Sequence, residues 1–394
     1  MNEIVIASAV RTAIGRFQGS LTPFSAPKLG SFAVKEAVRR AGIKPEMVDE
    51  VIMGCVITAG LGQNPARQAL LWGGIPNTVG AFTLNKVCGS GLKASILASS
   101  IIKAGDAKII VSGGMESMTN APYLSQDARA GLRLGNSKFI DAMVNDGLWD
   151  IYNNFHMGLT AELVSEKYKV TRQMQDEFAY NSHMKSALAT KEGKFKDEIV
   201  SVEIPQPKGK PPIIFNTDEG IRGDISVEKL AKLNPAFKEG GTVTAGNSSQ
   251  ISDGASAVVV MDMETAKKNN IKPLCRITGY ATGGMAPEWV MMAPVDAIRK
   301  LLALTKMKID DFDLIELNEA FAAQAVAVTR EIKANPDKVN INGGAVALGH
   351  PIGCSGSRVL TTLIYALKNR GLKKGLAALC LGGGNAVAMS VEML

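Results

Sequence analysis

Short apolar runs alternate with longer amphipathic segments along the first third of the chain. The predicted elements are strands at residues 4–9, 50–58, 80–87 and 108–112, and helices at 28–40, at 92–104 and from Pro65 onward. Gly42 follows the first helix, and Pro65 stands where a proline commonly opens a helix. Because strands and helices alternate, the pattern predicts an α/β protein with a largely parallel sheet and helices on its faces.

The alternation stops in the middle of the chain and later resumes. From about Thr119 to Thr244, polar segments and aromatic residues replace the regular pattern, which predicts an inserted lobe. Residues 256–261 are again typical of a buried strand, and the alternation continues from Leu274. The inserted lobe therefore interrupts one βα domain instead of following it.

The two ends of the chain resemble each other. The segment IKPEMVDEVIMG at residues 43–54 has a counterpart in MKIDDFDLIELN at residues 307–318. The segments that begin at Cys88 and at Gly353 both run through Ser-Gly, a long helix, a basic turn, an apolar strand and two or three glycines. Two matches in the same order indicate a duplication. We therefore expect two similar halves in one layered core, with a site at the seam between them.

Composition narrows the classes of protein that the chain can represent. Of its 394 residues, 46% are hydrophobic and 21% are charged, as in an ordinary globular protein. It contains no apolar run of the ~18 residues that a membrane helix needs, no secretory signal at residues 1–17 and no peroxisomal Ser-Lys-Leu ending. The net charge of +7 comes from scattered Lys and Arg without a nucleic-acid motif, and suits an anionic, phosphate-bearing small substrate equally well. We expect neither a membrane nor a nucleic acid as partner.

The five cysteines, at positions 55, 88, 275, 354 and 380, are widely spaced and form no Cys-x-x-Cys pair. An odd number with such spacing argues against a disulfide framework and against a zinc site. The cysteines therefore indicate reduced thiols and a cytoplasmic protein.

Cys88 lies between a predicted strand and a predicted helix, in the run VCGSGLK. At a helix N-terminus, unpaired N–H groups and the helix dipole favour thiolate, so we expect its pKa to lie below the usual value of about 8.5. The flanking glycines allow a sharp turn and a close approach of substrate. The alternative is a small buried apolar side chain.

Three residues of the second half are candidate partners of Cys88. His350, in the glycine-rich run NGGAVALGHPIG, could take a thiol proton and return it, or could be a structural loop residue. Cys380 ends an apolar strand before three glycines and could be a general acid and base, a structural residue or a disulfide partner. Asn318, between a strand and a helix, could be an N-cap or could hold a water or a carbonyl oxygen.

These runs resemble the thiolase family over nearly the whole chain, and within it the biosynthetic type. The motifs that carry the resemblance are AGLGQNPARQ, NKVCGSGLK, SGGMESM, HMG-x-TAE, TVTAGN, NEAFAAQ, NGGAVALGHPIG and C-x-GGG. The resemblance implies two duplicated βαβαβαββ halves in a five-layered α-β-α-β-α core with an inserted loop domain. The implied division is residues 1–119 for the N-terminal half, 120–250 for the loop domain, 251–272 for the return of the N-terminal half, and 273–394 for the C-terminal half.

The resemblance also implies a two-step ping-pong reaction. Cys88 would attack acetyl-CoA with His350 as base, and an acetyl-enzyme would form while CoA leaves. Cys380 would then deprotonate a second acetyl-CoA, whose carbanion attacks the acetyl group and gives acetoacetyl-CoA; the reverse is thiolysis. One oxyanion hole would be a water on Asn318 together with His350, and the other the N–H groups of Cys88 and Gly382. No metal or redox cofactor is expected, since the coenzyme A thioesters are substrates.

By the same resemblance, the loop domain would bind coenzyme A and hold a homotetramer together as a dimer of dimers. The implied substrate-binding residues are Leu148, His156, Met157, Arg222, Lys229, Phe237, Ala245, Ser249 and Phe321. Arg222 would face a phosphate or the adenine with its charged fork. Lys229 stands where the family often has a serine.

The segment from Trp289 to Pro294 departs from the family pattern Met-Gly-x-Gly-Pro and leaves the preferred acyl chain length open. A degradative 3-ketoacyl-CoA thiolase of longer chains is therefore the alternative function. A Cys-His-Asn hydrolase would leave Cys380 and the duplication unexplained. A dinucleotide-binding protein is disfavoured because no acidic residue follows the glycine run at the required distance. A lipid carrier of the same fold would lack one or more of the four catalytic residues.

Overall fold

The first half of the chain builds three successive strand and helix pairs. In the computed structural model, which describes residues 3–207 and 209–394, its elements are β1 (Ile4–Thr12), α1 (Ala26–Ala41), β3 (Glu50–Gly54), α2 (Pro65–Trp72), β4 (Gly80–Leu84), α3 (Ser90–Ala104), β5 (Ile109–Ser117) and β13 (Ser252–Asp262). The predicted strands and helices of this half are confirmed within a few residues. The first two residues of the predicted N-terminal half lie outside the described range.

The second half repeats this succession. Its elements are β14 (Cys275–Gly284), α8 (Ala293–Thr305), β15 (Leu314–Leu317), α9 (Ala322–Glu331), a single bridge at Val339, α11 (Ile352–Lys368), β16 (Lys374–Leu381) and β17 (Asn385–Met393). Val339 pairs in parallel with Ile315, as β4 pairs in parallel with β3. The predicted duplication is therefore visible in the order and pairing of the elements.

The strands form one mixed sheet in the order β15-β16-β17-β14-β1-β13-β5-β3-β4. The prediction of a largely parallel sheet was wrong, because β13 and β17 run antiparallel to both of their neighbours. β17 follows β16 through a tight turn without a helical crossover, and such a connection produces an antiparallel pair. The halves meet where β1 pairs with β14 over two residues, Val5↔Arg276 and Ile6↔Cys275.

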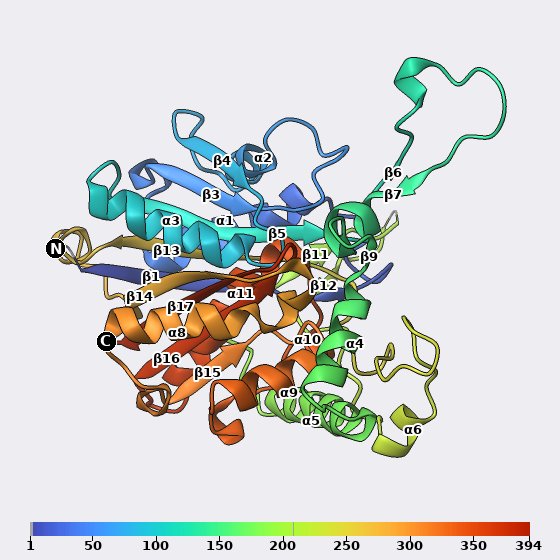
Figure 1. Ribbon diagram of the computed structural model, residues 1–394. Helices are drawn as coiled ribbons and strands as arrows, with labels where there is room; N and C mark the ends of the chain where they lie inside the picture. The colour runs from blue at the N-terminus through green and yellow to red at the C-terminus, as the bar shows by residue number, and fades with distance from the viewer. Residues whose placement is uncertain (1–2, 208) are drawn as a thin grey trace.

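The helices lie in three layers that alternate with the two halves of the sheet (Figure 1). α1 and α2 cover the outer face of the N-terminal half, α8 and α9 cover that of the C-terminal half, and α3 and α11 lie between the halves. Each of the three helix layers packs on the sheet through its own cluster of buried apolar side chains, and the central cluster includes residues of both halves of the sheet. The predicted α/β fold class with five layers is confirmed.

The central helices α3 and α11 approach each other closely through glycines. A Cβ added to Gly91 would lie 2.7 Å from the backbone nitrogen of Ser357, and one added to Gly356 would overlap the backbone nitrogen of Leu92. Glycine at these positions therefore sets the spacing between the two helices whose N-termini face the seam.

The segment between β5 and β13 forms the inserted lobe and an extension. Its elements are β6 (Tyr123–Leu124), β7 (Ile140–Asp141), β8 (Trp149–Asp150), β9 (Phe155–His156), α4 (Met157–Lys167), α5 (Arg172–Lys191), β10 (Ile199–Val200), β11 (Val202–Ile204), β12 (Ile213–Phe215) and α6 (Val227–Ala231). β6 and β7 are the base of a loop that projects from the body (Figure 1). The domain boundaries at 119, 250 and 272 stay predictions.

Other short elements include β2 (Gly15–Arg16), α7 (Met263–Lys268), the 3-10 helix η4 (Pro287–Met292) and α10 (Ala345–Leu348). No helix in the described part of the chain is both long and apolar enough to span a bilayer.

Candidate functional site

A cavity of about 470 Å³ lies at the seam of the two halves. Cys88 from the first half and His350, Cys380 and Gly382 from the second half all line it. Arginine and histidine side chains contribute to its wall, and no Asp or Glu of the described residues does. The duplication thus brings the four residues to one place, in a cavity whose charged side chains are all basic.

A strained turn presents Cys88 to this cavity. α3 begins at Ser90 with Gly89 as its N-cap, so Cys88 directly precedes the cap, as predicted. Val87 before it has φ 45°, which a β-branched residue rarely adopts and which costs on the order of 1–3 kcal/mol. A Cβ on Gly89 would overlap the side chain of Leu381, so glycine at this position allows the close approach of Leu381. The second half therefore holds the turn of the first half in place.

The predicted thiolate character of Cys88 was wrong for the resting protein. Burial raises the pKa of the Cys88 thiol to about 12. The N–H groups of Gly382 and of Cys88 itself point at the sulfur and lower the pKa, and the charge of Glu116 raises it. Burial outweighs the helix end because the protein surroundings of the half-buried Cys88 solvate a thiolate less well than bulk water does. Cys88 is therefore a neutral thiol until a base takes its proton.

His350 is oriented by hydrogen bonds to both of its ring nitrogens. Ser355 Oγ lies 2.6 Å from Nδ1 and donates its only proton to the carbonyl of Pro351 at 2.9 Å. The hydroxyl must then accept the Nδ1 proton, which leaves the lone pair on Nε2. Asn318 Nδ2 lies 3.3 Å from Nε2 and donates to it. This tautomer makes Nε2 the basic nitrogen.

The imidazole of His350 is also neutral at rest. Burial, followed by the charge of Arg358, lowers the pKa of His350 to about 3. The resting pair is therefore a thiol and an uncharged imidazole, and proton transfer must accompany attack on the substrate.

Cys380 lies at the end of β16 and is buried. Burial raises the pKa of its thiol, and the negative charge that Cys88 would carry raises it further. Cys380 and Cys88 line the same cavity. None of the five cysteines forms a disulfide. A second buried thiol in this cavity is suited to hold and release a proton.

Asn318 is buried behind His350 and is not part of the cavity wall. It does not cap α9, whose N-cap is Phe321, so the N-cap interpretation was wrong. Its backbone N–H bonds to the carbonyl of Ala378 beside Cys380. Among the described residues, Asn318 Oδ1 has no hydrogen-bond partner. The amide therefore has capacity left for a water molecule or a substrate oxygen.

Most of the predicted substrate-binding residues line the same cavity. They are Leu148, His156, Met157, Arg222, Phe237, Ala245, Ser249 and Phe321. The His156 ring stacks on Phe237 with centroids 4.7 Å apart, and Phe237 meets Phe321 edge to face at 6.0 Å. The three rings pack on one another and form part of the cavity wall.

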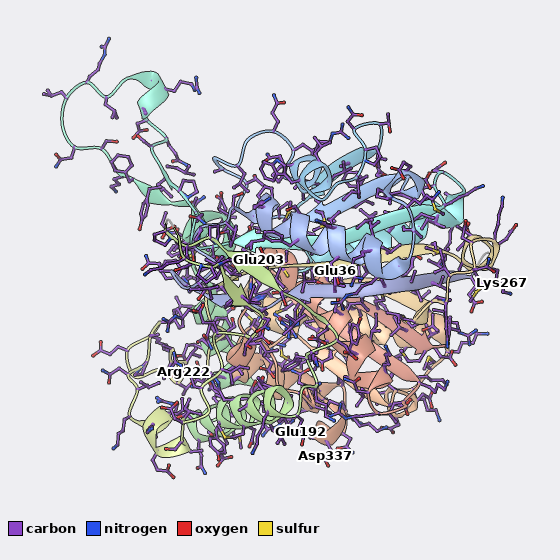
Figure 2. All side chains as sticks on the ribbon, turned by 180° about the vertical axis from the view of Figure 1, so that it is seen from behind. Glu36, Glu192, Glu203, Arg222, Lys267 and Asp337 are labelled. Carbon is purple, nitrogen blue, oxygen red and sulfur yellow. The ribbon has the colours of Figure 1, made fainter. Side chains whose placement is uncertain are left out.

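Lys229 does not line the cavity. It lies exposed on α6, and its Nζ donates to the backbone carbonyl of Asp224 at 2.7 Å. Figure 2 shows Arg222 on the loop before α6, at the side of the molecule where the inserted lobe lies. Arg222, and not Lys229, is therefore the basic residue of this loop that reaches the opening.

The structure adds residues that the sequence did not single out. Ser355 fixes the tautomer of His350. The only feature of the sequence that could have indicated this role is that a serine stands five residues after the histidine. Arg16 and Phe17 line the opening of the cavity. They lie far from every motif in the sequence, so no pattern indicated them.

Glu116 was also missed, although an acid within an apolar strand is itself a signal of function. Its buried carboxylate accepts the N–H groups of Val56 at 3.0 Å, Ile57 at 3.1 Å and Gly353 at 2.8 Å. Burial raises its pKa to about 7 against these hydrogen bonds. Glu116 therefore ties a loop of the first half to the start of α11.

The segment that departs from the family pattern contributes two residues to the cavity. Val290 and Met291 line it, whereas Trp289 does not. The Trp289 ring instead packs under the ammonium of Lys167, which lies 4.0 Å from the ring centroid. The Trp289 side chain therefore lies outside this cavity, and Val290 and Met291 form part of the cavity wall.

Comparisons with known proteins agree with this geometry over the whole chain. The chain is 53% identical to an acetyl-CoA acetyltransferase of Cupriavidus necator over 392 residues, which cover 100% of both proteins. It is 49% identical to a probable acetyl-CoA acyltransferase of Staphylococcus aureus, with 100% of this chain and 99% of that protein covered. The crystal structure of the Bacillus anthracis acetyl-CoA acetyltransferase superposes with a TM-score of 0.98 at 43% identity, covering 100% of this chain and 99% of that one.

Two family models divide the chain between them. The thiolase N-terminal domain matches residues 4–264, and the thiolase C-terminal domain matches residues 271–393. With both domains matched and the two cysteines, the histidine and the glycine turn gathered in one cavity, the chain belongs to the thiolase family.

Proposed function

We propose that the chain is an acetyl-CoA acetyltransferase, which condenses two acetyl-CoA into acetoacetyl-CoA and CoA and catalyses the reverse thiolysis. The observation that carries the proposal is the meeting of two neutral thiols from different halves with an oriented neutral imidazole in one cavity. A hydrolase would need only one of the thiols. The printed names of the relatives support the same activity.

In the first step, Cys88 Sγ attacks the thioester carbon of acetyl-CoA while His350 Nε2 takes the thiol proton. The N–H groups of Gly382 and Cys88, which face the sulfur, are placed to stabilise the oxyanion of an attached acetyl group. The bond to the CoA sulfur breaks, and Cys380 gives its proton to that sulfur. The products are acetyl-Cys88, CoA, an imidazolium and a Cys380 thiolate, and the total charge is unchanged.

In the second step, the Cys380 thiolate takes a methyl proton from a second acetyl-CoA. The imidazolium of His350 and a water held by Asn318 stabilise the enolate oxygen, and the carbanion attacks acetyl-Cys88. When Cys88 leaves as a thiolate, it takes back the proton that His350 has kept. Both thiols and the imidazole then return to the neutral forms that burial favours.

The Ser355 contact to His350 should matter for rate more than for substrate binding. We expect Ser355→Ala to lower kcat about 10-fold or more with little change in KM. The reason is that the Nδ1–H group of His350 loses its hydrogen-bond acceptor, so the tautomer with a basic Nε2 is no longer favoured. Steady-state thiolysis of acetoacetyl-CoA measures this effect. Ser357→Ala is the matched control, since its buried hydroxyl bonds to Ser256 and not to His350. Equal losses in the two variants would show that Ser355 only supports the helix.

The acyl chain length decides between this function and a degradative thiolase of longer chains. We expect thiolysis of acetoacetyl-CoA to be faster than thiolysis of 3-ketohexanoyl-CoA or 3-ketooctanoyl-CoA, because Met291 lies in the cavity wall where the family often has a smaller residue. The measurement is kcat/KM for the three substrates at saturating CoA. A higher value with the eight-carbon substrate would replace the proposed function by the degradative one.

We also propose a homotetramer in the cytoplasm. The extension at β6 and β7 supports the assembly, since its side chains Tyr123, Leu132, Leu134 and Phe139 are exposed and apolar. Such a patch is typical of a surface that another chain covers.

The absence of disulfides supports a reducing compartment. That the enzyme needs no cofactor stays an expectation; within the described residues no group of three His, Cys, Asp or Glu side chains could hold a metal ion.

A further inference from the structure

Arg16 is a basic residue at the opening of the cavity with no assigned role. It ends β2 and lines the cavity together with Phe17, Arg222 and Gln250. Its side chain is 66% exposed, and its guanidinium makes no hydrogen bond to any described residue. The guanidinium is therefore available to a ligand at the opening.

Backbone contacts join Arg16 to the loop that carries Arg222. Arg16 pairs with Ser252 of β13, and the N–H of Phe17 bonds to the carbonyl of Ile251 at 3.1 Å. Gln250, next to Ile251, donates from its side chain to the carbonyl of Gly220 at 2.9 Å. Arg222 follows Gly220 by two residues, so both arginines belong to one continuous rim.

Glu219 lies beside Arg16 without neutralising it fully. One carboxylate oxygen is 3.9 Å from Arg16 Nε, which is a long contact for an ion pair. The same carboxylate accepts the backbone N–H of Arg16 at 3.0 Å and the hydroxyl of Ser20 at 2.8 Å. Its oxygens are thus already engaged by Ser20 and the backbone, and it is not part of the cavity wall.

The charges of the cavity are distributed along its length. The buried part of the wall holds Cys380 and the neutral His350, while the exposed part holds the charges of Arg16 and Arg222. No carboxylate of the described residues lines either end. Two cations at one end of an apolar cavity, whose neighbouring acid Glu219 is engaged by Ser20 and the backbone, are suited to a ligand with an apolar arm and an anionic end.

We propose that Arg16 binds a phosphate group of coenzyme A at the same rim as Arg222. The inference rests on the proposed function, which makes coenzyme A the ligand and places its sulfur at Cys88. Coenzyme A carries three phosphate groups, and Arg222 alone offers them one guanidinium group. Arg16 adds a second guanidinium group from a different part of the chain. Guanidinium groups suit phosphate because their donors match its oxygens in pairs.

Thiol acceptors that differ in their phosphates test this contact. Thiolysis of acetoacetyl-CoA is measured with CoA, dephospho-CoA or pantetheine as acceptor, at an ionic strength of about 0.05 M to limit screening. We expect Arg16→Ala to lower kcat/KM for CoA about 3-fold, as for one exposed charge contact. With pantetheine, which has no phosphate, the ratio of wild type to variant should be near 1. Dephospho-CoA then shows whether the 3′-phosphate or the diphosphate is bound.

Arg299→Ala is the matched control. Arg299 is 65% exposed and lies 3.8 Å from Glu331, much as Arg16 lies from Glu219, but it is outside the cavity wall. We expect no selective loss in this variant, and Arg16→Lys should keep part of the preference for CoA. An unchanged kcat/KM for CoA in Arg16→Ala, or an equal loss with pantetheine, would overturn the inference. Failure of the proposed function would appear separately, as absent thiolysis by the wild-type protein.

Discussion

Serine in place of Cys88 is expected to lower the condensation rate by at least about 10⁴-fold and to abolish the acetyl-enzyme, since removal of a covalent nucleophile has effects of this size. The physical reason is the proton balance of the cavity. His350 is a weak base there, with a pKa lowered to about 3, and it can take a proton only from a group that is sufficiently acidic. A serine hydroxyl is far less acidic than the thiol, and the buried site would penalise its anion still more.

Mass spectrometry of intact protein after incubation with acetyl-CoA measures the acetyl-enzyme directly. The wild type should gain one acetyl group and Cys88→Ser none. Cys275→Ala serves as control, because it removes a buried thiol in β14 that does not line the cavity. Stable acetylation of the Cys88→Ser protein would mean that another residue is the nucleophile. Rapid loss of the acetyl group from wild type as free acetate would instead favour a hydrolase.

Replacement of Cys380 by serine should separate the two half-reactions. Condensation requires a base for the methyl proton, and a hydroxyl in the place of Cys380 cannot provide it, so we expect a loss of at least about 10³-fold, within the usual range for a general base. Acyl exchange between acetyl-CoA and labelled CoA needs only a proton for the departing sulfur. The imidazolium of His350 can return that proton, so exchange should persist at a reduced rate.

The decisive quantity is therefore the ratio of the acyl-exchange rate to the condensation rate, both measured on one preparation of Cys380→Ser. A rise of this ratio above that of wild type assigns the methyl proton to Cys380. Condensation at the wild-type rate would show that the base has been misassigned. Cys88→Ser, measured in parallel, should lose both reactions together, which distinguishes a missing base from a missing nucleophile.

The sequence predicted which residues would meet, because the duplicated pattern fixes where strands end. Cys88 and His350 each precede one of the two central helices, and Cys380 ends the strand that follows the second one. In an α/β core these positions lie at one edge of the sheet. The resemblance to the family implied His156 and Phe237 as binding residues, and the structure stacks their rings in the cavity wall.

The sequence could not predict how deeply these groups would be buried. The helix position of Cys88 is local information, but the loss of solvent that raises its pKa comes from segments hundreds of residues away. The same limit explains why the sequence did not show that Lys229 lies outside the cavity. Its distance from the cavity depends on the path of the loop before α6. Arg16 was missed for a similar reason, because only the pairing of β2 with β13 brings it to the opening.

The close packing of α3 on α11 also bears on how heat would inactivate the protein. The nucleophile and the base belong to different halves, and glycines at the crossing, Gly91 and Gly356, determine how far apart the two helix ends stand. A slight widening of this crossing would move Cys88 away from His350. Activity should then decline at temperatures below the unfolding transition, so that the spacing of two helices, and not global stability, sets the upper working temperature of the enzyme.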